Sequence, residues 1–387
     1  MARRNRDCRD RLKKQLVQVQ RRFGNTVLSP ISDLLTSAVF DVLLSAQNGG
    51  TSPEDVDRVA TYLARALELL PSSFGDRFVF DSQLVGTMAE EYSRGGVRLS
   101  GMLVPKPSKE WEHQTVAMPS TNRQNAHVID VIHLPGEDQL ADIDLLDYPF
   151  ICHELGHNIL FRGGEPFVAE FERELDSVLA GVQRQTVGVR GTAKRVADNT
   201  TDQMRKYWKP TSDQFNWAHE IAADVISLWL SGPAYLAALQ DVMETDGLNP
   251  YQLGQGHPPY EIRAKALVAA AGRLSWAYYT GPIQGLLDRW SAPSAMERSN
   301  LQVACEDPRL LNGAIAAAIR TCETLSLPCC TPERIATLEK NQRGGQPLGF
   351  GTDVLLAAWF TRSRSTETEY EEWERATIGR LLAEITG

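Results

Sequence analysis

The sequence predicts an α+β fold that is predominantly helical, with one small mixed sheet between helical N- and C-terminal regions. Apolar residues recur at helical spacing through about the first 75 residues, β-rich runs separated by turn residues follow, and helical spacing returns from residue 147. The chain of 387 residues, 42% of them hydrophobic, can bury more than one core. We therefore expect three regions, 1–75, 76–290 and 291–387.

The first region is predicted to consist of helices with a basic start. Leu12 and Leu16 fall on one helical face, and Ser52, placed directly before a proline, marks the start of a later helix. The segment "MARRNRDCRDRLKKQLVQVQRRF" is either an arm for an acidic partner or membrane surface, or a solvated helix face. The interleaved Asp7 and Asp10 favour the solvated face.

The predicted sheet comes next in the chain. The segments "FVFDSQLV", "GVRLSGMLVPKP", "QTVAMPS" and "AHVIDVIHLPG" alternate or are β-rich, and turn residues separate them. We expect them to be strands of one mixed or antiparallel sheet. His133, near the end of the last segment, is expected to be a strand residue and not a metal ligand.

Helices are predicted from residue 147 to the end of the chain. Breaks are expected at Gly163-Gly164, around Lys209-Pro210 and across "NPYQLGQGHPP". The tail, from about residue 293, is split by "SLPCC" and "NQRGGQPLGFGT". The glycine-rich break lacks the GxxxxGK[ST] order of a phosphate-binding loop, so we interpret it as an ordinary loop.

Composition narrows the class of protein. The net charge of −9 does not favour a nucleic-acid partner. No window holds 18 uninterrupted apolar residues, and the basic start lacks the apolar run of a secretory signal. The six cysteines show no paired CxxC spacing and are expected to be reduced thiols. We therefore expect a soluble cytoplasmic protein without a membrane span.

The segment "DYPFICHELGHNILFRGG" has the residue types of a metal site. Pro149 suits the first turn of a helix that Asp147 can cap, and on this helix His153 and His157 lie one turn apart on one side. Glu154 lies about 100° round from His153, so it flanks a metal held by the two imidazoles. A carboxylate placed there can take a proton from a zinc-bound water. Because HExxH also occurs by chance, a third ligand is required.

The segment "NWAHEIAADVISLWL" contains the candidate third ligand. Glu220 and Asp224 are four residues apart on a largely apolar helix and share a face. Glu220 would complete a set of three ligands, and Asp224 could accept the free ring N–H of a zinc histidine. His219 is a rival ligand that points about 100° away. The alternative is a pair of surface carboxylates.

The segment "GQGHPPYEIRAKAL" contains two polar groups at a turn that enters a helix, His257 and Arg263. A zinc hydrolase needs a hydrogen-bond donor opposite the metal to stabilise the developing oxyanion, and either residue could serve. Considered alone, His257 fits an ordinary turn histidine.

These three segments, in this order, resemble the gluzincin metallopeptidases. HELGH, "EIAAD" and "HPPYEIR" are similar in particular to the family of CAAX-processing and heat-shock membrane proteases and their soluble relatives. The resemblance covers about residues 147 to 270 and implies a zincin-like catalytic domain with one zinc ion per chain. The resemblance implies that His153, His157 and Glu220 are zinc ligands and that Glu154 is the catalytic base. It also implies that Asp224 contacts a zinc ligand, and that His257 and Arg263 contact the transition state.

The function implied is that of a zinc-dependent endopeptidase that hydrolyses a protein or peptide substrate through a zinc-bound water activated by Glu154. The chain lacks the membrane-spanning helices of the membrane members, so we do not expect it to act on their membrane substrates. "AHVIDVIHLPG" is expected to be an edge strand that pairs with the substrate. Two alternatives stay open: a binding or sensor protein with little turnover on the same scaffold, and a zinc hydrolase of a non-peptide amide.

The helical ends do not match the resemblance. We expect the regions before residue 75 or after residue 293 to cover the cleft or recruit the substrate. The last helix has an apolar stripe formed by Ile378, Leu381, Leu382 and Ile385. The alternative is that this stripe completes the core.

Overall fold

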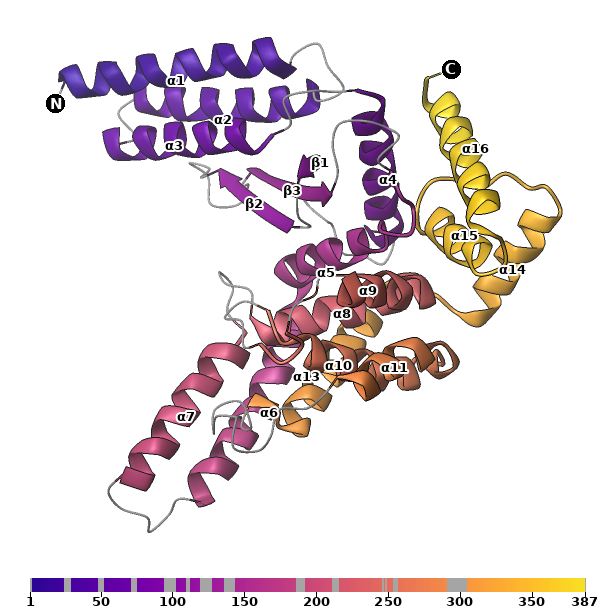
Figure 1. Ribbon diagram of the computed structural model, residues 1–387. Helices are drawn as coiled ribbons and strands as arrows, with labels where there is room; N and C mark the ends of the chain where they lie inside the picture. Colours follow the sequence, from indigo (N-terminus) through magenta and orange to yellow (C-terminus); the bar gives the residue numbers. More distant parts are fainter. Residues whose placement is uncertain are drawn as a thin grey trace. The chain divides into compact units, whose positions relative to one another are not determined.

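The computed structural model is predominantly helical with one small sheet, as predicted (Figure 1). It describes residues 2–23, 29–47, 52–70, 75–93, 102–108, 112–118, 127–135, 143–185, 192–210, 216–245, 247, 249–252, 257–290 and 305–386.

The chain forms two compact units. Unit 1 comprises Met1–Thr87, Ser100–Ile143 and Leu381–Gly387, and unit 2 comprises Met88–Leu99 and Asp144–Arg380. The sheet belongs to unit 1 and the helices that carry the HExxH and "EIAAD" segments belong to unit 2. The three predicted regions divide the chain at other positions, and that division stays a prediction.

Three helices of unit 1 lie side by side: α1 (Ala2–Phe23), α2 (Ser29–Gln47) and α3 (Pro53–Leu69) (Figure 1). The predicted start of α3 is confirmed, because the Ser52 hydroxyl accepts a hydrogen bond from the backbone N–H of Asp55 at 3.1 Å. One apolar core joins these helices to the sheet. Its members are Leu12, Leu16, Val19, Leu35, Val39, Val42, Val56, Val59, Ala60, Leu63, Leu70, Phe78, Val104 and Val131.

The sheet is mixed, as expected, and has the order β1-β3-β2. β1 (Met102–Ser108) runs parallel to β3 (His127–Pro135), and β2 (Glu112–Met118) runs antiparallel to it. The expectation that "AHVIDVIHLPG" forms an edge strand is wrong, because β3 pairs with a neighbour on both sides. Its backbone groups are engaged with β1 and β2, so β3 cannot receive a substrate strand. His133 lies buried within β3, as expected of a strand residue.

The expectation of a strand at "FVFDSQLV" is also wrong. These residues belong to α4 (Asp76–Ser93). The buried residues Phe78, Asp81, Leu84, Met88 and Tyr92 recur every three or four positions, which is the period of a helix. The short β-rich run at its start conceals this longer pattern.

Unit 2 is built of helices. They are α5 (Phe150–Gly163), α6 (Glu165–Gln185), α7 (Thr192–Trp208), α8 (Trp217–Ser231), α9 (Pro233–Thr245), α10 (Tyr260–Arg273), the 3₁₀ helix η2 (Ala277–Thr280), α11 (Gly281–Arg289), α13 (Pro308–Thr324), α14 (Pro332–Arg343), α15 (Thr352–Arg362) and α16 (Glu367–Thr386), whose last residues extend into unit 1. The predicted breaks fall between them.

Helix α8 contacts α5, α10 and α13, among others, and every residue from Trp217 to Leu228 is buried. A helix that is apolar on all sides is expected to be enclosed in this way.

Two observations bear on the expected class of protein. Among the described residues, no helix is long and apolar enough to span a membrane. The cysteines with described side chains are free thiols, namely Cys152, Cys305, Cys322, Cys329 and Cys330.

Helix α16 contributes to the packing of the protein. Ile378 and Leu381, two members of its apolar stripe, are buried. On the same helix, the Glu374 carboxylate accepts hydrogen bonds from the backbone N–H of Leu145 at 2.7 Å and from the hydroxyl of Tyr370 at 2.9 Å. Burial, with Asp144 nearby, raises the pKa of Glu374 to about 7. That the region after residue 293 covers the cleft or recruits the substrate stays a prediction.

The raised pKa of Glu374 predicts that the free energy of unfolding falls as the pH rises toward 7. Between its ordinary pKa in the unfolded chain and about 7 in the folded chain, the native state holds a proton that the unfolded state has lost. Glu374→Gln keeps the acceptor oxygen but removes the charge. It should therefore raise the free energy of unfolding at about pH 8 by about 1 kcal/mol after allowance for solvent screening.

Urea unfolding of both proteins between about pH 5 and about pH 8 measures this effect. Glu372→Gln, which changes an exposed carboxylate on the same helix, is the control and should leave the pH profile as it is. Equal pH profiles for the wild type and Glu374→Gln would contradict the prediction.

Candidate metal centre

Helix α5 presents two histidines inside the protein. It starts at Phe150 after a turn, with Pro149 at the cap position and no side-chain cap, so the expected cap by the Asp147 side chain is not formed. It ends at Gly163, as predicted, and the N–H of Gly164 donates to the carbonyl of Leu160 at 2.9 Å. Every residue from Phe150 to Leu160 is buried, so this helix is enclosed as its apolar composition predicts.

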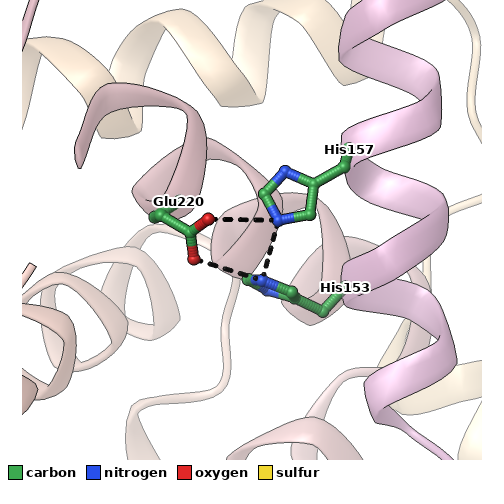
Figure 2. Close-up of side chains that lie close together, drawn as sticks. All are labelled: His153, His157 and Glu220. Carbon is green, nitrogen blue, oxygen red and sulfur yellow. Dashed lines mark hydrogen bonds and ion pairs between the residues drawn. The ribbon is translucent and has the colours of Figure 1, made fainter. Parts of the chain in front are cut away.

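His153, His157 and Glu220 converge on one point (Figure 2). The Nε2 atoms of His153 and His157 lie 3.1 Å apart. Glu220 Oε2 lies 3.4 Å from Nε2 of His153, and Glu220 Oε1 lies 3.3 Å from Nε2 of His157. Each of the three residues is at most 5% exposed. All three ligand atoms lie within 4.8 Å of one another, a spacing that suits a single metal ion.

The rival ligand His219 is not part of this group. Its ring centroid lies 5.9 Å from that of Phe167, and burial lowers its pKa to about 4. Of the two candidates on α8, the structure therefore brings Glu220 to the histidines.

The start of α8 places Glu220. The Asn216 side chain accepts hydrogen bonds from the N–H groups of Ala218 and His219 at 3.0 and 3.3 Å, and the N–H of Glu220 donates to the Asn216 carbonyl at 2.9 Å. This N-cap fixes the first turn of the helix, where Glu220 lies. The carboxylate is thus held by local backbone structure.

Gly156 lets α5 approach α8 closely. A Cβ atom at this position would lie 3.2 Å from both the Cα and the carbonyl oxygen of Ala223. Such contacts are tighter than nine in ten real Cβ contacts, so the α8 backbone would have to shift by a few tenths of an ångström. The ligands come from both helices, so the distance from the histidines to Glu220 depends on this contact.

The three side chains of the group influence one another's protonation. Two imidazole lone pairs repel at 3.1 Å unless a proton or a cation lies between them. Burial lowers the pKa of His153, but hydrogen bonds to Asp224 and Glu220 outweigh burial and raise it to about 10. Burial raises the pKa of Glu220, but the charge of His157 and the hydrogen bonds of the histidines lower it well below its usual range. Two imidazoles and a carboxylate are a donor set that fits zinc.

Asp224 and Arg263 form an ion pair behind His153. Asp224 Oδ1 lies 3.0 Å from His153 Nδ1, the ring nitrogen that does not face the ligand group. Arg263 donates to the same carboxylate through Nε at 2.9 Å and Nη2 at 2.6 Å. Burial raises the pKa of Asp224, but the Arg263 charge lowers it well below its usual value. The guanidinium is thus engaged with Asp224, which favours a positioning role for Arg263 over the predicted role as oxyanion donor.

His257 is the exposed member of the site. Its side chain is 75% exposed, and its Nδ1 lies 3.0 Å from Glu220 Oε2. The hydrogen bond to Glu220 raises the pKa of His257. Pro258 and Pro259 follow directly and lead into α10, so the entry to that helix holds His257 beside the buried carboxylate. Glu154, the predicted base, lies buried on α5 next to His153.

Sequence reasoning missed two contacts of α5. The Cys152 Sγ lies 3.3 Å from the hydroxyl of Tyr92, which lies 3.3 Å from the Oγ1 of Thr352 at the start of α15. This contact connects the C-terminal helices of unit 2 to the helix with the histidines. The second contact is made by Tyr235, whose hydroxyl lies 3.1 Å from His153 Nδ1. The sequence signal for Tyr235 is its position just after "SGP", a short connection that brings α9 back onto α8.

Comparison of the chain with protein-family models, with curated proteins and with solved structures finds no match. Any function assigned to the site therefore depends on the residues and geometry described above.

We predict that Gly156→Ala destabilises the protein and weakens metal binding. In a helix without tertiary contacts, glycine to alanine stabilises by up to about 1 kcal/mol. At Gly156 the contacts with Ala223 oppose this gain, and the cost of overpacking is typically about 1–3 kcal/mol. The control is Gly379→Ala in α16, where nothing lies within 4 Å of the added Cβ and stabilisation is expected.

Thermal unfolding and zinc titration of both variants measure the two effects. A rise in the melting temperature for both variants, with unchanged zinc affinity, would show that the close approach of α5 to α8 does not hold the site together.

Proposed function

We propose that the protein is a zinc-dependent endopeptidase with a zincin-like catalytic centre. The observation that carries this proposal is the buried group of His153, His157 and Glu220, with Glu154 on the same helix as the histidines. Three protein ligands, and not four, are typical of catalytic zinc, because one position must stay free for water or substrate.

Peptide hydrolysis at this site would use Glu154 beside the metal. Bound zinc would polarise a peptide carbonyl and lower the pKa of a water molecule. Glu154 would accept a proton from this water as its oxygen forms a bond to the carbonyl carbon. As the C–N bond breaks, Glu154 would return the proton to the amine nitrogen of the leaving product. Water is consumed and an acid and an amine are released, so no other reactant is required.

We expect His257 to act on the substrate. It is the exposed residue next to Glu220, whereas the ligands themselves are buried. A protonated imidazole there could donate a hydrogen bond to the oxyanion that develops in the transition state. Arg263 would contribute indirectly, since its guanidinium holds Asp224 against His153.

Glu154→Gln tests the proposal. The amide cannot accept the proton, so cleavage should fall by at least about 10³-fold while the bound zinc and the fold are retained. Cleavage of a mixed peptide library by the zinc-loaded protein, read by mass spectrometry, measures the activity, and metal analysis measures the zinc.

Glu165→Gln, at an exposed position at the start of α6, is the control and should cleave like the wild type. Loss of zinc from Glu154→Gln would show that this residue is a ligand or a structural group and not the base. A zinc-loaded wild type that cleaves no peptide would contradict the peptidase function itself.

His257→Ala should lower kcat by about 10²- to 10³-fold, because a transition-state donor is lost, and should leave zinc content and KM nearly unchanged. Steady-state kinetics on a peptide identified from the library, together with metal analysis, measure this. An unchanged kcat would mean that His257 is only part of the turn, and loss of zinc would mean that it is a fourth ligand.

A further inference from the structure

Tyr235 reaches the back of His153 through a sharp connection between two helices. Helix α8 ends at Ser231. Gly232 follows with a φ of 52°, in the region that favours glycine, and α9 starts at the next residue, Pro233. Tyr235 lies in the first turn of α9, and its N–H donates to the Gly232 carbonyl at 3.2 Å. Its side chain is fully buried, and its ring meets that of Phe150 edge-on at 5.8 Å. The ring is therefore held in one place.

The Tyr235 hydroxyl completes a triangle with His153 and Asp224. It donates to Asp224 Oδ1 at 2.5 Å and lies 3.1 Å from His153 Nδ1, and Nδ1 itself lies 3.0 Å from Asp224 Oδ1. The two rings are nearly parallel, with an interplanar angle of 12°. All three groups are buried, so bulk solvent does not compete for their hydrogen bonds.

The hydrogen-bond donors and acceptors around His153 determine its tautomer. The Asp224 carboxylate only accepts hydrogen bonds, and Arg263 already donates to it twice. The single hydroxyl proton of Tyr235 is used on Asp224, so its oxygen can only accept from the ring. Both neighbours of His153 Nδ1 are therefore acceptors, and Nδ1 must carry a hydrogen. The lone pair of the neutral ring is then on Nε2, which faces His157 and Glu220.

We infer that Tyr235 is a positioning residue that fixes the tautomer and the ring orientation of the metal ligand His153. This inference depends on the zinc site of the proposed function. Asp224 alone could accept the Nδ1 hydrogen, but Tyr235 adds a second acceptor beside it and fixes the carboxylate oxygen that it shares with the ring. Such contacts behind a metal ligand typically change metal affinity by about 10- to 100-fold.

Tyr235→Phe removes the hydroxyl and keeps the buried ring. Asp224 retains both hydrogen bonds from Arg263 in this variant, so the fold should be kept. Competition with a chelator should show a zinc Kd that is about 10- to 100-fold higher than that of the wild type. The control is Tyr370→Phe, which removes another buried hydroxyl that donates to a carboxylate, that of Glu374, and should leave the Kd unchanged.

A double-mutant cycle separates positioning from a general effect on stability. If Tyr235 acts through the shared hydrogen bonds, Tyr235→Phe should change the Kd by much less in an Asp224→Asn background than in the wild type. The melting temperatures of the metal-free proteins show whether each variant is folded.

The outcomes distinguish this inference from the proposed function. An equal Kd for the wild type and Tyr235→Phe would overturn the inference while the zinc site stands. So would a full effect of Tyr235→Phe in the Asp224→Asn background, because it would show that the hydroxyl acts independently of the triangle. A wild-type protein that binds no zinc would instead remove the proposed function and, with it, the ground for the inference.

Discussion

The close approach of α5 to α8 is the constraint on which the site depends. The histidines lie on one helix and Glu220 lies on the other, so their ligand atoms meet only if the two backbones come together. Gly156 and Ala223 are the small residues at this contact, and a Cβ at position 156 would require the neighbouring backbone to shift by a few tenths of an ångström. The apolar faces of both helices are buried around it. Packing thus sets the distance, and the ligand spacing follows from it.

The second constraint is the charge inside this packed region. Glu220 and Asp224 are two buried carboxylates on one helix, and buried charges are unfavourable unless they are paired. Arg263 pairs with Asp224, and His153 lies between the two acids. His257 contacts the Glu220 carboxylate, and a zinc ion among His153, His157 and Glu220 would add further positive charge beside it. This arrangement of charges is compatible with a metal at the point where the three ligand atoms meet.

Sequence reasoning succeeds here where a feature depends on residues that are close together in the chain. The helical period alone puts His153 and His157 on one side, and the Ser52 cap is likewise a matter of adjacent residues. It fails where distant elements decide: the central place of β3 depends on its two partner strands, and the position of Tyr235 depends on the turn at Gly232. The ion pair of Arg263 with Asp224 is a further contact of this kind, because the partner is on another helix and cannot be read from the spacing of "HPPYEIR".

X-ray absorption at the zinc edge, combined with metal analysis, tests the central claim most directly. We expect about one zinc per chain after purification without chelator, with nitrogen and oxygen neighbours at about 2.0–2.2 Å and the outer-shell signal of two imidazoles. The His157→Ala protein should show weaker zinc binding and one imidazole fewer. Sulfur neighbours at about 2.3 Å, or no zinc bound even after its addition, would contradict the assignment of His153, His157 and Glu220 as the metal site.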